Sequence, residues 1–318
     1  MTIVAVGIDL AKNVFAIHGV DEAGKAVLVR PNVARGKLLE LMASLPPCLV
    51  GMEACSGAHH WARQLQQLGH TARIMAPKFV APYRMGGKHG KNDAADAAAI
   101  CEAVQRPGMR FVPIKSIDQQ GQLMVHRARQ GFVQERTALI NRIRGLLSEL
   151  GIVLPLKAQT VRRQAHLHLE DLPGWANLVI GDLLSQLHHL DEHIAEYDRH
   201  IALMARGLPQ AKRLMQLPGI GATTASALVS TIGAGHDFNT GRQFAAWLGL
   251  TPRQHSSGGK ARLGRITKAG DSYLRNLLVL GARAVLQAAL REKDPRQDGT
   301  SRWARELVQW RGYWRTIV

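Results

Sequence analysis

The sequence predicts a mixed α/β domain followed by two mostly helical regions. Three observations lead to this expectation: strands and helices alternate over the first third, an apolar heptad pattern fills the middle, and basic helical stretches with Gly-rich turns fill the last third. We therefore expect domains at residues 1–112, 113–207 and 208–318 of the 318-residue chain.

The first domain is expected to hold a mixed sheet. Apolar runs separated by turn residues such as DEAGK predict a three-strand meander, and helices then alternate with further strands. The predicted elements are strands at 2–8, 14–20 and 26–30, a helix at 35–45, a strand at 47–53, a helix at 57–69 and a strand at 71–77.

The middle region carries an apolar heptad pattern. No proline occurs from Ser116 to Leu150, a segment in which Val125, Phe132, Leu139 and Leu146 recur every seven residues. After a link that contains prolines, spacings of four and three alternate through Leu183, Leu187, Leu190, Ile194, Tyr197, Ile201 and Met204. This seam predicts either a helical hairpin within the chain or a coiled coil between chains, and the pattern does not separate the two.

The C-terminal region begins with LPGIG, residues 217–221, between two helical stretches. A turn of this kind resembles a helix-hairpin-helix, in which Gly219 and Gly221 would let backbone N–H groups approach a phosphate. An ordinary helix–helix turn is the alternative. The remaining residues read as mostly helical, with a loop at TPRQHSSGGKARLG.

The charge predicts a polyanionic partner. The chain has a net charge of +17 and a pI of about 10.5. Residues 211–318 contain 17 Lys and Arg against 6 Asp and Glu, a net of +11, so the C-terminal third is expected to face nucleic acid.

Cysteine usage and hydropathy predict a cytoplasmic protein, close to the nucleoid if DNA is its partner. The three cysteines have spacings of neither a disulfide framework nor a zinc site. The N-terminal MTIVAVGIDLAKN lacks the basic region and long apolar run of a signal peptide. No stretch reaches the ~20 apolar residues of a membrane span, so no membrane partner is expected.

Four carboxylates are candidates for a metal site. Asp93 and Asp96 are helical neighbours after a loop with Lys88, His89 and Lys91, and with Asn92 as cap they could simply favour the helix N-terminus. Asp9 and Glu53, however, each end an apolar strand, and an ionised group there needs a partner or a metal. If the four converge, two divalent ions there could support phosphodiester cleavage.

The order of three segments carries a specific resemblance. GIDLAKN, GMEACSGAHHW and KNDAADAAAI are similar to the RuvC-like, ribonuclease-H-fold domain of DEDD insertion-sequence transposases, a family that includes pilin-gene invertases and bridge-RNA-guided recombinases. The C-terminal run from LPGIGATTASALVSTIG to KAGDSYLR resembles the second domain of that family. Together they cover nearly the whole chain, with one departure: the sequence stops at RGYWRTIV, where relatives usually continue into a further helix.

The resemblance implies a DNA recombinase that cuts and rejoins strands through a serine nucleophile. Asp9, Glu53, Asp93 and Asp96 would be the DEDD ligands of Mg²⁺ or Mn²⁺, and Ser257, rather than Ser256, would form a covalent phosphoserine. The serine of one protomer would meet the acidic site of another, which implies a homo-oligomer, a dimer or tetramer. Some members of the family use a bridge RNA as guide.

The residues of the serine loop have their own chemistry. Two glycines after the serines let the loop approach a backbone closely, and His255 is a candidate to orient a hydroxyl. The basic residues that follow suit phosphate contacts: Lys260, Arg262, Arg265, Lys268 and Arg275. A loop whose serines merely donate hydrogen bonds to phosphate is the alternative. The rival functions are a metal-dependent nuclease or junction resolvase, and a nucleic-acid-binding protein without catalysis.

Overall fold

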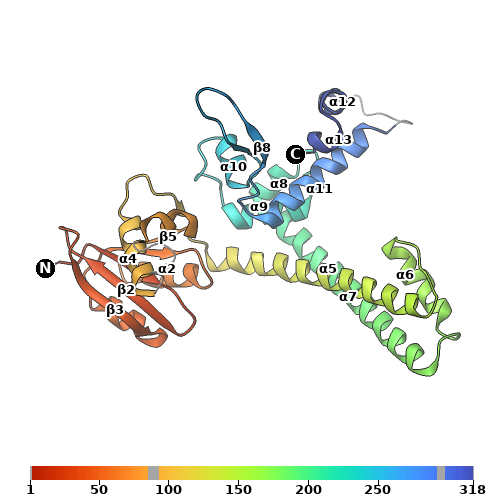
Figure 1. Ribbon diagram of the computed structural model, residues 1–318, viewed down its shortest axis with the longest axis horizontal. Coiled ribbons are helices and arrows are strands. Elements are labelled where there is room, and N and C mark those ends of the chain that lie inside the picture. The colour runs from red at the N-terminus through yellow and green to blue at the C-terminus, as the bar shows by residue number, and fades with distance from the viewer. Residues whose placement is uncertain (1, 85–92, 292–297, 318) are drawn as a thin grey trace. The chain divides into compact units, whose positions relative to one another are not determined.

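The computed structural model describes residues 2–84, 93–291 and 298–317. The chain forms two compact units, Met1–Ser116 and Ile117–Val318, and Figure 1 labels their elements. None of the described helices is both long enough and apolar enough to cross a membrane. The finer division expected at residue 207 stays a prediction.

A six-stranded mixed sheet forms the centre of the first unit, in the order β3-β2-β1-β4-β5-β6. β1 is antiparallel to β2 and parallel to β4, so the predicted meander and the mixed α/β class are confirmed. The short β6, which the apolar pattern did not predict, pairs with β5 at the edge. The strands are β1 Ala5–Asp9, β2 Val14–Val20, β3 Ala26–Ala34, β4 Leu49–Glu53, β5 Thr71–Met75 and β6 Phe111–Val112.

Helices cover both faces of this sheet. Because side chains alternate along a strand, Val6 and Ile8 of β1 point to one face, where they pack with Leu65 of α2 in the main core. Ala5 lies on the other face, with Cys101 of α4. The helical elements are η1 Arg35–Lys37, α1 Leu38–Ala43, α2 Ala58–Gln67, α3 Pro77–Val80, η2 Ala81–Tyr83 and α4 Asp93–Val104.

Two glycines bring α4 unusually close to the sheet. Gly7 of β1 and Gly51 of β4 are directly paired across the parallel strands. A Cβ at Gly7 would lie 2.2 Å from the carbonyl oxygen of Ala97, and one at Gly51 would lie 2.8 Å from the Cβ of Val104. Only glycine therefore permits this helix–sheet contact, which we call the glycine platform.

Two long antiparallel helices dominate the start of the second unit (Figure 1). Leu187 and Leu190 of α7 (Gly174–Gly207) are buried with Ile143 of α5 (Ile117–Glu149), so this seam closes within one chain. The structure thus favours the hairpin over the coiled coil between chains. On α5 the heptad prediction is off by one residue at its end, since Leu146 is 40% exposed and Leu147 is buried.

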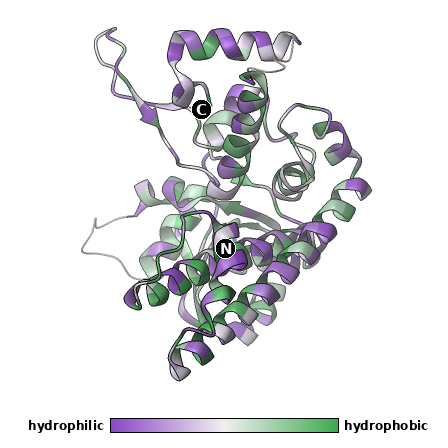
Figure 2. Ribbon diagram, turned by 90° about the vertical axis from the view of Figure 1, so that its right-hand side faces the viewer, coloured by the Kyte–Doolittle hydropathy of each residue, from purple (hydrophilic) through white to green (hydrophobic). Residues whose placement is uncertain are grey.

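The second unit also contains further helices and a small two-stranded hairpin. Figure 2 shows hydrophilic and hydrophobic residues side by side along many helices, as expected for helices packed on one side only. The elements are α6 Ala158–Gln164, η4 Ala165–His168, α8 Pro209–Leu214, α9 Ala222–Ile232, α10 Gly241–Trp247, α11 Ser272–Ala289, α12 Gly299–Arg311 and α13 Tyr313–Thr316, with strands β7 Pro252–Gln254 and β8 Leu263–Ile266.

A buried histidine joins three helices of the second unit. His126 of α5 is 1% exposed, and its Nε2 and Nδ1 lie 3.1 Å from the hydroxyls of Ser226 and Tyr273, respectively. Burial, with the charge of Arg129 adding, lowers the pKa of His126 to about 4. Ser226 donates to the carbonyl of Ala222, so a neutral ring that donates from Nε2 and accepts at Nδ1 satisfies every group.

Candidate active site

The predicted carboxylates end neighbouring elements of the first unit. Asp9 is the last residue of β1 and Glu53 the last of β4, and these strands run parallel and adjacent. Both residues lie two positions beyond a platform glycine, so both side chains point to the α4 face. α4 lies over Gly7 at Ala97, so the preceding turn, which carries Asp93 and Asp96, is brought to the same edge.

Arg84 holds two of these carboxylates together. Its Nη2 donates to Oε1 of Glu53 at 3.0 Å, and its Nε lies 2.8 Å from Oδ1 of Asp96. The second contact is an ion pair without the alignment of a hydrogen bond, so Nε and Oδ1 are buried with no hydrogen-bond partner in the described part of the chain. This arginine was not singled out from the sequence, because its role depends on a fold that returns it to the strand ends.

The electrostatic field of the cluster acts on Asp9. Burial raises the pKa of Asp9 from its ordinary value of 3.8 to about 6, with the negative charges of Asp96, Asp93 and Glu53 adding to the effect and Arg84 opposing it. Burial also raises the pKa of the nearby Cys55 thiol, again with negative charge from Asp9 and Glu53. Within the described part of the chain, the guanidinium of Arg84 does not balance the charge of the four carboxylates.

Carboxylate oxygens are suitable ligands for a divalent cation, although the four side chains are not arranged around a single point. Among the described residues, no three His, Cys, Asp or Glu side chains are arranged to hold an ion. The buried, unaligned Oδ1 of Asp96 and the raised pKa of Asp9 are both features that a cation would relieve. Of the residues that the structure describes, Arg84 provides positive charge at this edge. The predicted cap Asn92 and the loop residues Lys88, His89 and Lys91 lie outside the described residues.

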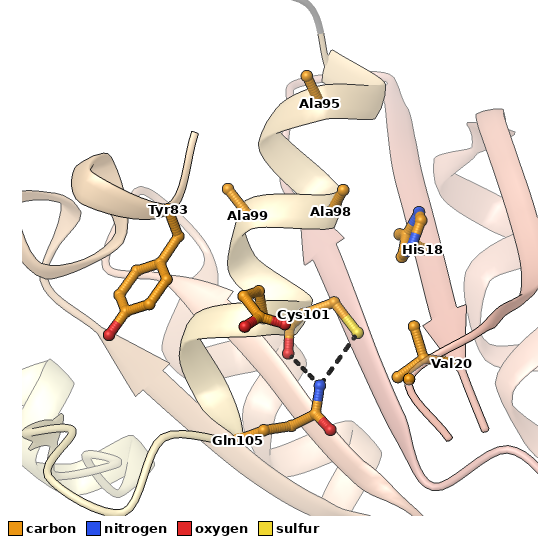
Figure 3. A pocket seen from close by; sticks show the side chains of 10 residues that line it. His18, Val20, Tyr83, Ala95, Ala98, Ala99, Cys101 and Gln105 are labelled. Atoms are coloured by element: carbon orange, nitrogen blue, oxygen red, sulfur yellow. Dashed lines mark hydrogen bonds between the residues drawn. The ribbon is translucent and has the colours of Figure 1, made fainter. Parts of the chain in front are cut away.

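A hollow beside α4 is separate from the carboxylates. His18 of β2 lies on one side of the helix and Tyr83 on the other, with the small side chains of Ala95, Ala98 and Ala99 between them (Figure 3). At the lower end of the hollow in this view, Gln105 Nε2 donates a hydrogen bond to the carbonyl of Cys101 at 2.8 Å. Burial lowers the pKa of His18, and none of the four clustered carboxylates lines this hollow.

The predicted serine loop is a β-hairpin in the structure. β7 and β8 are antiparallel, and Ser257 pairs with Lys260 across a two-residue turn of Gly258 and Gly259, both with positive φ. Ser256 Oγ accepts a hydrogen bond from the backbone N–H of Arg262, so this serine helps to hold the strands together. Ser257 lies exposed at the tip. The loop expectation was wrong because the hairpin buries little and so lacks an alternating apolar pattern.

The basic residues near the hairpin fall into two groups. Lys260, Arg262, Arg265 and Lys268 are exposed on or beside it, as a phosphate-binding surface requires. Arg275 differs, because its Nη1 donates to the carbonyls of Leu248 and Gly270 and so ties α11 to the end of α10.

The LPGIG turn packs on α11. Gly219 has φ +82°, and a Cβ there would lie 2.8 Å from the carbonyl oxygen of Gly281. Gly221 is the N-cap of α9 and has open space around its Cα. Gly219 is therefore required by the turn itself, whereas Gly221 leaves the N–H groups of α9 approachable.

Comparison with known proteins finds a family match for each half of the chain. A profile described as "Transposase", of the IS110 DEDD type, matches residues 6–152, and one described as "Transposase IS116/IS110/IS902 family" matches residues 211–297. A "Probable family 20 transposase" of Pseudomonas aeruginosa is 46% identical over 97% of this chain and 90% of its own length. The transposase for insertion sequence element IS1111A of Coxiella burnetii is 38% identical over 98% of this chain and 85% of its own length.

A shorter similarity is to a protein named for gene inversion. The pilin gene-inverting protein of Moraxella lacunata is 31% identical over 101 residues, 30% of this chain and 31% of its own length. Together the matches define the class, a transposase, and transposases act on DNA. Within that class the chain belongs to the IS110/IS116 family of DEDD transposases.

Proposed function

We propose that the chain cuts and rejoins DNA strands with a ribonuclease-H-type, RuvC-like acidic site and a serine nucleophile. The observation that supports the acidic site is the glycine platform, which brings α4 and its aspartates to the edge where Asp9 and Glu53 end their strands. The strand order, an antiparallel meander followed by parallel strands, also supports this fold assignment.

The acidic site would bind Mg²⁺ or Mn²⁺ through Asp9, Glu53, Asp93 and Asp96. A bound divalent ion supplies positive charge to the scissile phosphate and to the oxygen that leaves it. Arg84 neutralises part of the carboxylate charge, and its ion pairs with Glu53 and Asp96 compete with ligation of a cation.

Ser257 would be the nucleophile. Its Oγ gives up its proton and forms a bond to the scissile phosphorus, the bond from phosphorus to the leaving sugar oxygen breaks, and that oxygen takes up a proton. Reversal with a new sugar hydroxyl restores the serine and joins the strands. Ser256 is less suited because its hydroxyl accepts the Arg262 N–H. Lys260 and Arg262, exposed near the tip, would hold the phosphate.

Denaturing a cleavage reaction with labelled DNA tests this chemistry. We expect label attached to protein with the parent chain and with Ser256→Ala, and none with Ser257→Ala, although Ser257→Ala still binds DNA. Attachment that persists in Ser257→Ala and disappears in Ser256→Ala would move the assignment by one residue. Persistence in both would exclude this hairpin from the chemistry.

A second function is supported by the same acidic site. If water rather than serine attacks, the protein is a metal-dependent nuclease or resolvase, and cleavage would proceed without any covalent adduct in all three proteins. Binding without cleavage would instead indicate a protein that only holds nucleic acid.

We further propose that the acidic site and the serine are shared between protomers of a homo-oligomer. The two groups lie in different compact units of the chain, which is compatible with such sharing. Mixing Ser257→Ala with Asp93→Asn protein should restore some cleavage if the sites are shared, and none if each is built within one chain. Sequencing of copurified nucleic acid would show whether a guide RNA of the bridge type is bound.

A further inference from the structure

The last two helices expose an unusual amount of tryptophan. Three of the six tryptophans lie in α12 and α13, and Trp303, Trp310 and Trp314 are 59%, 74% and 73% exposed. Tryptophan is on average a highly buried residue, and grouped exposed aromatic side chains commonly mark a binding surface. We call these three residues the tryptophan patch.

α12, which carries Trp303 and Trp310, is anchored through its opposite side. Ala304 and Val308 of α12 pack with Leu286 and Ala289 of α11. Arg305 Nη1 donates to the carbonyl of Ala289 at 3.0 Å. Since the inner side of α12 is held by these contacts, the exposed tryptophans on its outer side are presented by a fixed scaffold.

The N-terminus of α12 is anchored as well. Asp298 is the N-cap of α12, and its carboxylate accepts hydrogen bonds from both the backbone N–H and the hydroxyl of Ser301. Tyr313, partly buried in the same core, contacts Trp314 edge to face with ring centroids 5.2 Å apart. The patch is therefore fixed at one end by a helix cap and at the other by a core residue, Tyr313.

The positive charge around the patch favours an anionic ligand. Arg302, Arg311 and Arg315 are exposed beside the tryptophans, and the guanidinium carbon of Arg311 lies 4.4 Å from the centroid of the Trp310 ring. Glu306 is the exposed acid of these two helices. A symmetric contact between two copies of the patch would bring arginines against arginines, so a second chain is a poor occupant.

The spacing fits stacked bases. Trp303 and Trp310 are seven residues apart, which places them on one side of α12 with a separation of about 10.5 Å along its axis. That distance is about three base steps of a strand at 3.4 Å each. In a duplex the base faces are covered by their neighbours, whereas an unpaired strand offers them to aromatic rings.

We propose that the tryptophan patch binds an unpaired segment of nucleic acid, with bases stacked on Trp303, Trp310 and Trp314 and phosphates contacted by Arg302, Arg311 and Arg315. This site is distinct from the serine hairpin and its basic residues. It does not depend on the proposed strand-transfer chemistry, since it concerns binding alone.

The test compares unpaired and paired probes with the full chain in EDTA, so that no strand is cut. Fluorescence anisotropy would be measured with oligo(dT), oligo(U) and a mixed-sequence duplex of about 20 nucleotides, a length that spans the patch. The variants are Trp303→Ala/Trp310→Ala and, as a matched control, Trp175→Ala, which removes a tryptophan of α7 that is even more exposed (84%).

We expect the double variant to lose roughly fivefold or more in affinity for unpaired strands per tryptophan, with duplex binding unchanged. Trp303→Phe/Trp310→Phe should retain most of the affinity, and Trp175→Ala all of it. The ratio of oligo(dT) to oligo(U) affinity decides whether displaced DNA or RNA is the preferred source. Tryptophan fluorescence of the parent chain should be quenched on binding.

Three results would overturn the proposal. They are unchanged binding of unpaired strands by the double variant, an equal loss for duplex and unpaired probes, and a decrease in sedimenting mass that reveals the patch as a protein interface. Should the alanine variant fail to fold, the phenylalanine variant compared with Trp303→Leu/Trp310→Leu, which removes the rings but keeps apolar bulk, makes the same comparison.

Discussion

Replacing Gly7 by alanine should displace the helix that carries two of the four carboxylates. The added Cβ would lie 2.2 Å from the carbonyl oxygen of Ala97 and 2.4 Å from the backbone nitrogen of Cys101. Both are backbone atoms of α4, so no side chain can rotate away to relieve the overlap. Since ordinary contacts begin near 3.4 Å, α4 must move outward by about 1 Å.

The size of the effect follows from that displacement. Overpacking of a close-packed contact costs about 1–3 kcal/mol, and a backbone-to-backbone overlap belongs at the upper end, so we expect a loss of about 3 kcal/mol. A shift of about 1 Å in catalytic groups can lower the rate by about a hundredfold. The nearest neighbours of the Cβ that Gly51→Ala adds are side-chain atoms, among them the Cβ of Val104 at 2.8 Å and the Cγ2 of Ile100 at 3.2 Å, and the change should cost about 1 kcal/mol.

Two assays separate these effects. Hydrogen exchange of β1 and α4 amides followed by mass spectrometry reports on the first unit alone, which matters because a chain with two compact units need not unfold in one step. Strand cleavage with saturating Mg²⁺ reports on the placement of the carboxylates. Gly36→Ala is the matched control, because nothing lies within 4 Å of its Cβ position, and it should stay within about 0.5 kcal/mol.

The reasoning would be refuted if Gly7→Ala matched the parent chain both in amide hydrogen exchange and in strand cleavage. It would also be refuted if Gly36→Ala were as damaging as Gly7→Ala, since the effect would then follow from glycine replacement in general rather than from the contact with α4. The expected order of damage is Gly7, then Gly51, then Gly36.

Three further predictions concern other buried groups. The pKa of Asp9 is about 6 in the folded protein against an ordinary 3.8, so the metal-free protein should lose stability as the pH rises from about 4 to 6 and change little above pH 6. Thermal denaturation across this pH range checks the prediction, and the Asp9→Asn variant should lack the loss. Added Mg²⁺ should restore the stability of the parent chain at pH 7. Leu190→Lys places a charge in the buried seam between α5 and α7. We expect the free energy of unfolding, measured by urea denaturation, to fall by at least about 3 kcal/mol, rather than an oligomer to dissociate with its protomers still folded. His126→Ala leaves the hydroxyls of Ser226 and Tyr273 without their ring partner and should cost about 2–4 kcal/mol; an unchanged midpoint in urea would contradict the assigned hydrogen bonds.

The fold was predictable where local patterns carry it. The apolar strands of the first unit and the seam of α7 each bury a face that repeats with the period of its element, so the type of element can be read directly. The boundaries were less exact, since the strands predicted at 2–8 and 26–30 are Ala5–Asp9 and Ala26–Ala34. The hairpin around Ser257 was missed because nearly all of its residues are exposed and its pairing rests on the Gly258-Gly259 turn. On α5, Leu147 replaced Leu146 in the core because a 33-residue helix drifts from a strict seven-residue repeat.

The candidate site was predictable in its acids and not in its basic partner. Asp9 and Glu53 could be recognised because a charge that ends an apolar strand is unusual. Arg84 carries no such signal, since an arginine in a polar segment is ordinary until the chain returns it to the strand ends. The glycine platform was equally hidden, because Gly7 and Gly51 acquire their meaning only when two strands pair in one register and a helix crosses both.

The hairpin that presents Ser257 has a further consequence for the timing of the reaction. A two-stranded hairpin with its residues exposed is only marginally stable by itself, and such hairpins form in about 1–10 μs. Enzymes typically turn over about 1–1,000 times per second. If Ser257 is the nucleophile, as proposed, these timescales would let the hairpin form and re-form many times within one catalytic cycle. Arrival of the serine would then not set the rate, and slower events such as strand separation or assembly would.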